Sequence, residues 1–80
     1  MTLKEAIANR IIELCGEKGI TTYALAILCG VDKSTIYSII GEKSKSPEVA
    51  TIKKICDGLE ITLGKFFGTP EFDALEQELE

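Results

Sequence analysis

The residues with the greatest capacity for chemistry lie between positions 33 and 41, where a lysine, two serines and a tyrosine recur at helical spacing. At about 100° per residue, these polar members occupy one arc of roughly 140°, and three isoleucines fill much of the remainder. This pattern predicts a helix with one face on a core and a polar face toward solvent. The polar arc holds Lys33, Ser34, Tyr37, Ser38 and Gly41, with Thr35 near its boundary.

A cation, hydroxyls and a phenol on one exposed helix face suit hydrogen bonding to the base edges of DNA. Asp32, just before this helix, is a natural N-cap whose carboxylate would accept from backbone N–H groups of the first turn. Lys33 and Ser34 would then lie in that first turn, the part of a recognition helix that reaches bases in the major groove. The alternative interpretation is an ordinary helical hairpin whose polar face is merely solvated.

A second short helix must support this one. Thr21 or Thr22 is predicted to cap its start, and Gly30 is predicted to end it in the left-handed conformation. Residues 21–40 therefore predict two short helices joined by a tight turn, with the second as the working element. The apolar stripe of the supporting helix is predicted to be Leu25, Ala26, Leu28 and Cys29.

Three further helices are predicted around this pair. The first covers residues 2–18, with Thr2 and Glu5 as a capping box. The second covers residues 48–59, and the third is a short helix capped by Thr62. Their apolar stripes are Leu3, Ile7, Ile11 and Leu14 in the first, Val49, Ile52, Ile55, Cys56 and Leu59 in the second, and Leu63, Phe66 and Phe67 in the third.

The segment after the working helix, residues 41–47, is a loop by composition and carries two lysines. Lys43 and Lys45 would lie beside the groove and are predicted to bind the DNA backbone, since phosphate contacts fix the position of a protein on the duplex. A solubilising surface loop is the alternative. Arg10 and Lys18, on the polar side of the first helix, are weaker candidates for the same backbone role.

Residues 69–80 are predicted to form an acidic tail that follows a helix-turn-helix domain over residues 1–68. Thr69 and Pro70 would cap and begin an amphipathic helix about ten residues long, which is marginal in isolation. The tail must therefore lie against its own domain or a second subunit. We expect a subunit contact, because a two-fold dimer sets two groove helices one DNA turn apart. The apolar residues of the tail are Phe72, Leu75 and Leu79.

The distribution of charge bears on DNA binding. The whole chain has a net charge of −4, which argues against a general binder of polyanions. Residues 1–70 hold nine Lys and Arg against eight Asp and Glu, a balance of +1, whereas the final ten residues hold five acidic groups and no Lys or Arg. The acidity is thus a property of the tail. A modestly cationic surface around Lys33 is compatible with binding that depends on base contacts.

The chain has no histidine, and its three cysteines lack CxxC spacing. Each of Cys15, Cys29 and Cys56 lies on or beside an apolar helical face, which predicts buried free thiols. The sequence offers no signal peptide, no apolar run of about 18 residues and no set of residues for metal binding or general-base catalysis. We therefore expect a cytoplasmic protein that is not an enzyme, with no cofactor, small-molecule substrate or membrane.

Three motifs are spaced as in a known family. They are RIIELCGEKGIT, then LA and CGVDKSTIYSI, then SPEVATIKKICDGLEITLGKFF. Over residues 4–67 the chain resembles the lambda-repressor and Cro type helix-turn-helix regulators, also called the XRE family. The resemblance implies an all-α, compact, five-helix lambda-repressor-like DNA-binding domain that acts as a homodimer on a short inverted repeat of double-stranded DNA. By position, Thr21 and Thr22 would contact phosphate, Lys33, Ser34, Tyr37 and Ser38 would face bases and adjoining backbone, and Lys43 and Lys45 would hold phosphates.

The sequence is compatible with two functions of different classes. The leading hypothesis is a sequence-specific transcriptional regulator, expected to be a repressor, which places the helix over residues 33–40 in the major groove. The alternative is a protein-interaction module, such as an antitoxin or a partner-binding regulator, which uses its acidic C-terminal tail. Its basis is the negative net charge and the presence of Thr22 where a glutamine often opens the supporting helix of the family.

Overall fold

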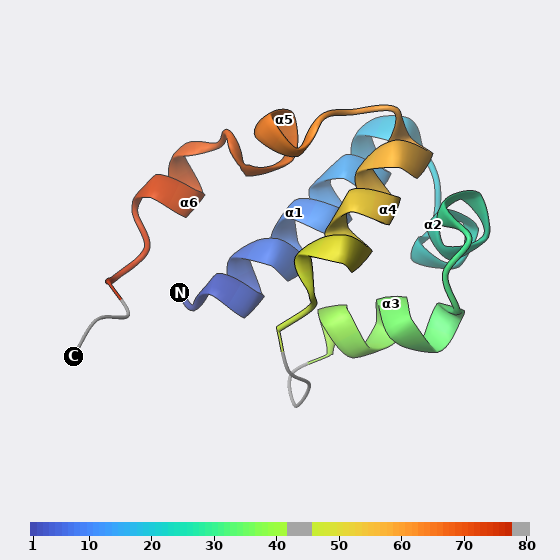
Figure 1. The fold of residues 1–80 in the computed structure, drawn as a ribbon, viewed down its shortest axis with the longest axis horizontal. Coiled ribbons are helices and arrows are strands. Elements are labelled where there is room, and N and C mark those ends of the chain that lie inside the picture. The colour runs from blue at the N-terminus through green and yellow to red at the C-terminus, as the bar shows by residue number, and fades with distance from the viewer. Residues whose placement is uncertain (42–45, 78–80) are drawn as a thin grey trace.

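The computed structural model of this 80-residue chain describes residues 1–41 and 46–77. Over these residues the chain is helical and without strands, and the predicted all-α architecture of five helices and a short tail helix is confirmed (Figure 1). Among the described helices, none has the length and apolarity needed to span a membrane. The helices are α1 (Leu3–Lys18), α2 (Thr22–Cys29), α3 (Lys33–Ile40), α4 (Val49–Leu59), α5 (Leu63–Phe67) and α6 (Pro70–Asp73).

Side-chain caps begin three of these helices at the positions that the sequence predicts. The Thr2 hydroxyl accepts from the N–H of Glu5 at 3.2 Å, and the Thr2 N–H donates to the Glu5 carboxylate at 3.0 Å, which completes the capping box. The hydroxyls of Thr21 and Thr62 each accept, at 3.0 Å, from the N–H three residues later. Gly30 ends α2 with a φ of 69°, in the left-handed region that favours glycine.

Two acidic residues occupy helix ends with different outcomes. Glu60 follows α4 with a φ of 58° and a ψ of 43°, and this positive φ costs a residue other than glycine about 1 kcal/mol. Asp32 stands at the N-cap of α3, but its carboxylate makes no cap hydrogen bond, so the predicted capping by this side chain is wrong. The backbone carbonyl of Asp32 instead opens the helix by accepting from the N–H of Thr35 at 2.9 Å.

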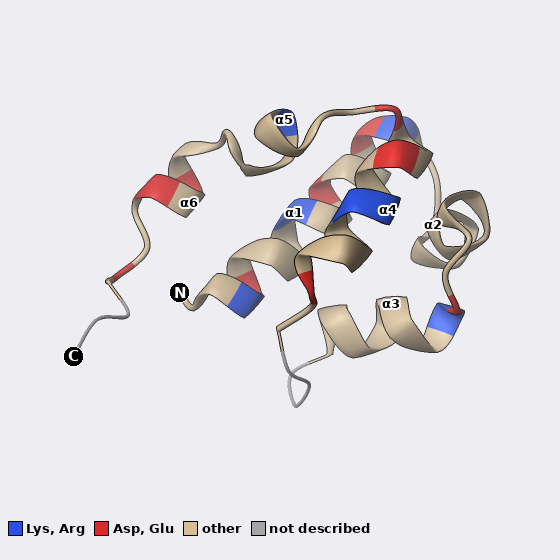
Figure 2. Ribbon diagram, in the orientation of Figure 1, with Lys and Arg blue, Asp and Glu red and all other residues tan. Residues whose placement is uncertain are grey.

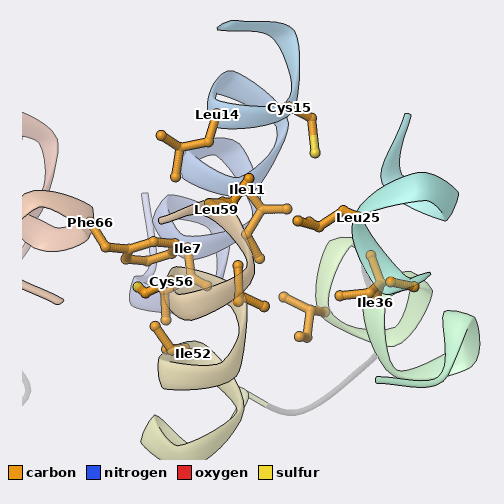
Figure 3. Close-up of a cluster of buried hydrophobic side chains, with 13 residues drawn as sticks. Ile7, Ile11, Leu14, Cys15, Leu25, Ile36, Ile52, Cys56, Leu59 and Phe66 are labelled. Carbon is orange, nitrogen blue, oxygen red and sulfur yellow. The ribbon is translucent and has the colours of Figure 1, made fainter. Parts of the chain in front are cut away.

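The hydrophobic core lies between the helices and is filled mainly by isoleucine and leucine (Figure 3). Ile11, Leu25 and Ile36 come from α1, α2 and α3, and each is 0% exposed. Ile52 of α4 and Phe66 of α5 belong to the same cluster (Figure 3). Burying a side chain of this size contributes about 1.5–3 kcal/mol, so the core holds α3 by its isoleucine face.

Three apolar residues assigned to core stripes from the sequence are exposed. Leu3 is 36% exposed, Leu28 is 56% exposed and Val49 is 65% exposed. Leu3 and Val49 are the first residues of α1 and α4, where a helix extends past the core. In α2, Leu25 and Ala26 are both buried, so the arc of the helix that faces the core is centred between them. At about 100° per residue, Leu28 falls outside that arc.

The α2 helix meets α4 at a glycine. A Cβ on Gly58 would lie 2.4 Å from the Sγ of Cys29 and 2.9 Å from its Cα, so only a glycine lets the two helices approach this closely. The Cys29 thiol also donates to the backbone carbonyl of Ile55, with 3.6 Å between sulfur and oxygen. These contacts fix the last residue of α2, and therefore the turn into α3, on the surface of α4.

Arg10 is a structural residue and not the exposed phosphate contact considered from the sequence. It is 9% exposed, and its guanidinium donates to the backbone carbonyls of Lys65 and Phe66, both at 2.8 Å. It also pairs with the Glu13 carboxylate. A cation at the C-terminal end of a helix complements the helix dipole, so Arg10 holds α5 against α1. Lys18, the other candidate on α1, is exposed.

The tail helix is shorter than predicted. It covers Pro70–Asp73 and ends at Ala74, in place of the expected length of about ten residues. Residues 74–77 continue without helical structure. Leu79, the last of the apolar tail residues, lies outside the described residues.

The tail helix packs on its own domain. Phe72 lies against Phe66 and Phe67, with ring centroids 6.2 Å and 5.0 Å apart, and α6 contacts α1. Of the two large apolar tail residues that the structure describes, Phe72 joins the core cluster and Leu75 does not. A single packed side chain gives a marginal helix little support, which explains why α6 is short.

Candidate nucleic-acid interface

The polar face of α3 is exposed, as the sequence predicts. Lys33, Ser34, Tyr37 and Ser38 all lie at the surface, and Tyr37 is 48% exposed. On the opposite face, Ile36 and Ile39 are 0% and 3% exposed, while Thr35 and Ile40 are half-buried between the two faces. The structure therefore brings the predicted hydrogen-bonding groups together on one ridge and anchors that ridge from behind.

The N-terminal end of α3 presents backbone donors as well as side chains. Because the Asp32 carboxylate makes no cap hydrogen bond, the N–H groups of the first turn have no side-chain cap. The positive end of the helix dipole lies at the same place, next to the Lys33 ammonium. Such an end attracts anions such as the phosphates of DNA.

The C-terminal end of α3 is tied to α1 by Lys4, a residue that the sequence analysis did not single out. Its Nζ donates to the backbone carbonyl of Ile39 at 3.2 Å and to that of Gly41. The signal for this role was present, because at about 100° per residue Lys4 falls close to Ile11 and so belongs to the buried side of α1. A lysine in that position buries its stem and brings its charge to the nearest partner.

Tyr23 is a second residue that the sequence analysis missed. It is the second residue of α2, it is 49% exposed, and the Nζ of Lys33 lies 5.8 Å from the centroid of its ring. This distance is within the range of a cation–π interaction. The available signal was that Tyr23 falls outside the apolar stripe of α2, but its partner could not be identified before the two helices were placed.

Two residues predicted to contact the DNA backbone lie at the start of α2. The Thr21 side chain is exposed, and its hydroxyl accepts from the Ala24 N–H, which leaves the hydroxyl proton available to donate. Thr22 is half-buried. Lys43 and Lys45, the predicted phosphate contacts of the loop after α3, lie outside the described residues.

The described surface around α3 carries little charge. Figure 2 shows one basic residue on α3, at its N-terminal end, and an acidic residue immediately before it. These are Lys33 and Asp32, and Glu48 is a further acidic residue, just before α4. A surface of this kind gives little non-specific attraction to DNA, so binding would depend on specific contacts.

The three cysteines belong to the core and not to a reactive site. Cys15 and Cys56 are buried, Cys29 is half-buried, and all three are free thiols, as predicted. Burial raises the pKa of each thiol, and raises that of Cys29 to about 11. The thiols are therefore neutral near pH 7.

Comparisons with known proteins bear on this surface. A family described as the Cro/C1-type HTH DNA-binding domain matches residues 10–71. The crystal structure of prophage Lp1 protein 11 is similar with a TM-score of 0.84 and 29% identity, covering 94% of this chain and 99% of that one. An HTH_3 family transcriptional regulator from Vibrio cholerae is similar with a TM-score of 0.72 and 37% identity, covering 81% of this chain and 36% of that one. A comparison with curated proteins found no match.

These findings confirm the resemblance that the sequence motifs indicate. The matching family is a class of DNA-binding domains and not of enzymes, as expected from the sequence. The chain spans nearly the whole of the prophage protein, but only 36% of the Vibrio cholerae regulator.

Proposed function

Because this chain belongs to the Cro/C1-type helix-turn-helix family of DNA-binding domains, we propose that it is a sequence-specific transcriptional regulator that inserts α3 into the major groove. The observation that supports the groove position is the exposed ridge of Lys33, Ser34, Tyr37 and Ser38 on a helix anchored by buried isoleucines. A ridge of this kind combines the hydrogen-bonding groups and the convex shape that direct contact with base edges requires.

Each predicted residue has a role that follows from its position. Lys33, in the first turn, would donate to the O6 and N7 acceptors of guanine, which lysine commonly recognises. Ser34, Tyr37 and Ser38 would contact neighbouring bases and backbone, with Thr35 at the edge of the ridge. The remaining residues, which would bind phosphates, are Thr21 and Thr22 at the start of α2 and Lys43 and Lys45 in the following loop.

The same proposal includes a homodimer that represses transcription from a short inverted repeat. One domain with a weakly cationic surface offers few contacts, and two domains on two half-sites would double them. The segment over residues 69–80 would contribute to the dimer, with α6 using the side that does not pack on α1 and the phenylalanines of α5. The free thiols and the DNA target support a cytoplasmic location.

Selection from a randomised duplex pool, followed by fluorescence anisotropy, tests this proposal. Lys33→Ala should weaken binding to the selected duplex by about 1–3 kcal/mol and relax the preference at one base position. Lys65→Ala removes an equal charge from α5, away from α3 (Figure 1), and should change binding little. Failure to enrich any duplex at low salt would contradict the DNA-binding function.

A protein-interaction module is the second candidate, and the exposed apolar residues of α2 favour it. Ile27 and Leu28 are 67% and 56% exposed on a helix with no charged residue. Together with the acidic tail, this surface is suited to another protein, as in an antitoxin or a partner-binding regulator. Recovery of a stable heterologous complex, together with no enriched duplex, would support this candidate over the first.

A further inference from the structure

The first turns of α2 and α3 form a small cluster of Tyr23 and Lys33, of which the proposed DNA contacts use only Lys33. The N-terminal end of α3 packs beside α2 (Figure 1), and this brings the Lys33 Nζ to 5.8 Å from the centroid of the Tyr23 ring. Tyr23 is 49% exposed. About half of its surface is therefore not used to fill the core, and the residue lies beside the proposed interface.

No ion pair competes for Lys33 within the part of the chain that the structure describes. The two ion pairs recorded there join Arg10 to Glu13 and Lys53 to Asp57. Neither pair involves Lys33. Asp32 is its neighbour in sequence, but the ion pairs recorded among the described residues do not join the Asp32 carboxylate to the Lys33 ammonium. Among the described residues, the Tyr23 ring is therefore the group recorded beside this ammonium, at a distance where a cation–π interaction can restrain it.

Restraint matters for a lysine because its side chain loses more rotamer freedom on ordering than most others. A flexible ammonium can neutralise any nearby phosphate, whereas an ammonium held in one direction can favour a particular base edge. A ring beneath the ammonium therefore has more influence on the choice of base than on the total attraction to DNA.

We propose that Tyr23 is a positioning residue for Lys33, which holds the Lys33 ammonium toward a guanine and so sets part of the sequence preference. This inference rests on the proposed DNA-binding function. The aromatic face of Tyr23 is the required feature, and its hydroxyl is not. The partner chemistry is the pair of acceptors, O6 and N7, on a guanine in the major groove.

Two substitutions separate the ring from the rest of the side chain. Tyr23→Leu keeps an apolar side chain but removes the aromatic face, whereas Tyr23→Phe keeps the face and removes the hydroxyl. In the free protein, NMR should show the ε-CH₂ protons of Lys33 shifted upfield by the ring current. Tyr23→Leu should abolish this shift and Tyr23→Phe should retain it.

The DNA measurement uses the selected duplex and a copy in which one base pair is changed, at the position whose preference Lys33→Met abolishes. Tyr23→Leu should reduce discrimination between these duplexes by about two- to fivefold, the range expected of an exposed cation–π contact. Tyr23→Phe should restore the discrimination. In a Lys33→Met background, Tyr23→Leu should have no further effect on it.

The outcomes distinguish this inference from the function on which it rests. Absence of the ring-current shift overturns the positioning role, as does an equal loss of affinity for both duplexes in Tyr23→Leu. If the wild-type protein selects duplexes and Tyr23→Leu discriminates normally, only the positioning role fails. If the wild-type protein selects no duplex, the DNA-binding function fails and this inference with it.

Discussion

The two ends of α3 are held in different ways. At the C-terminal end, the Lys4 ammonium donates to the carbonyls of Ile39 and Gly41 and ties the helix to α1. At the N-terminal end, the Asp32 carboxylate makes no cap hydrogen bond, and Lys33 lies over an exposed aromatic ring. The end proposed to meet DNA has no side-chain cap, while the opposite end is anchored. In this helix of only eight residues, the C-terminal end is attached to α1 and the N-terminal end is left for the proposed contact with DNA.

The largest effect on stability is expected from truncating Ile36, a buried side chain of α3 that packs in the core. Ile36 is 0% exposed, and Ile36→Ala should reduce the free energy of unfolding by about 2–5 kcal/mol, because the change removes buried surface and leaves a cavity. Urea denaturation followed by circular dichroism measures this loss. Ser38→Ala, on the exposed face of the same helix, should change stability by no more than about 0.5 kcal/mol. Equal losses would mean that the isoleucine face does not hold α3.

A smaller effect is expected at the contact that fixes the turn before α3. In Gly58→Ala, the new methyl group would meet Cys29 at 2.4 Å and 2.9 Å, which should destabilise the protein by about 1–3 kcal/mol despite the higher helix propensity of alanine. Gly16→Ala is the matched control, since no atom lies within 4 Å of its new Cβ. Thermal unfolding should show a lower Tm for the first variant and a higher Tm for the second. The same sign in both would refute the close approach of α2 and α4.

Removing the tie at the C-terminal end of α3 should cost less. Lys4→Met keeps much of the apolar stem but loses the donors to two backbone carbonyls, and we expect a loss of about 1–2 kcal/mol. In Lys4→Met, native-state hydrogen exchange should accelerate more in the last turn of α3 than in its first turn. Lys54→Met, at an exposed position on α4, controls for the loss of charge and should leave both rates unchanged.

The smallest effects are expected at the N-terminal ends of α2 and α3, where a paired comparison is informative. The Thr21 hydroxyl makes a cap hydrogen bond of 3.0 Å, and Thr21→Ala should cost about 1 kcal/mol. Asp32→Ala removes no cap hydrogen bond and should cost less than about 0.5 kcal/mol. Chemical denaturation of both variants in one buffer measures the difference. A larger cost at Asp32 would show that the first turn of α3 is capped after all.

Much of this molecule could be predicted because its signals are local. The period of the isoleucines gave the orientation of α3, and the threonine and glycine caps gave the ends of α1, α2 and α5. The exposed ridge of Lys33, Ser34 and Tyr37 belongs to the same class, since it depends on helical period alone.

The remaining features depend on which helices meet. The sequence could not show that Arg10 would bind the carbonyls of α5, that Lys4 would bind those at the end of α3, or that Tyr23 would lie beneath Lys33. Each of these contacts joins residues on different helices. Leu28 was misplaced for a related reason, because the inward direction of α2 is set by its packing on α3 and α4. Periodicity can identify an apolar arc but cannot locate its centre to within one residue.

The left-handed backbone at Glu60 has a practical consequence for experiments on this protein. Glu60→Gly would relieve a strain of up to about 1 kcal/mol at a site remote from α3. The added stability would let this variant tolerate further substitutions that destabilise the fold. Alanine scanning of the whole ridge could then be carried out on folded material, with every loss of affinity attributed to a missing contact.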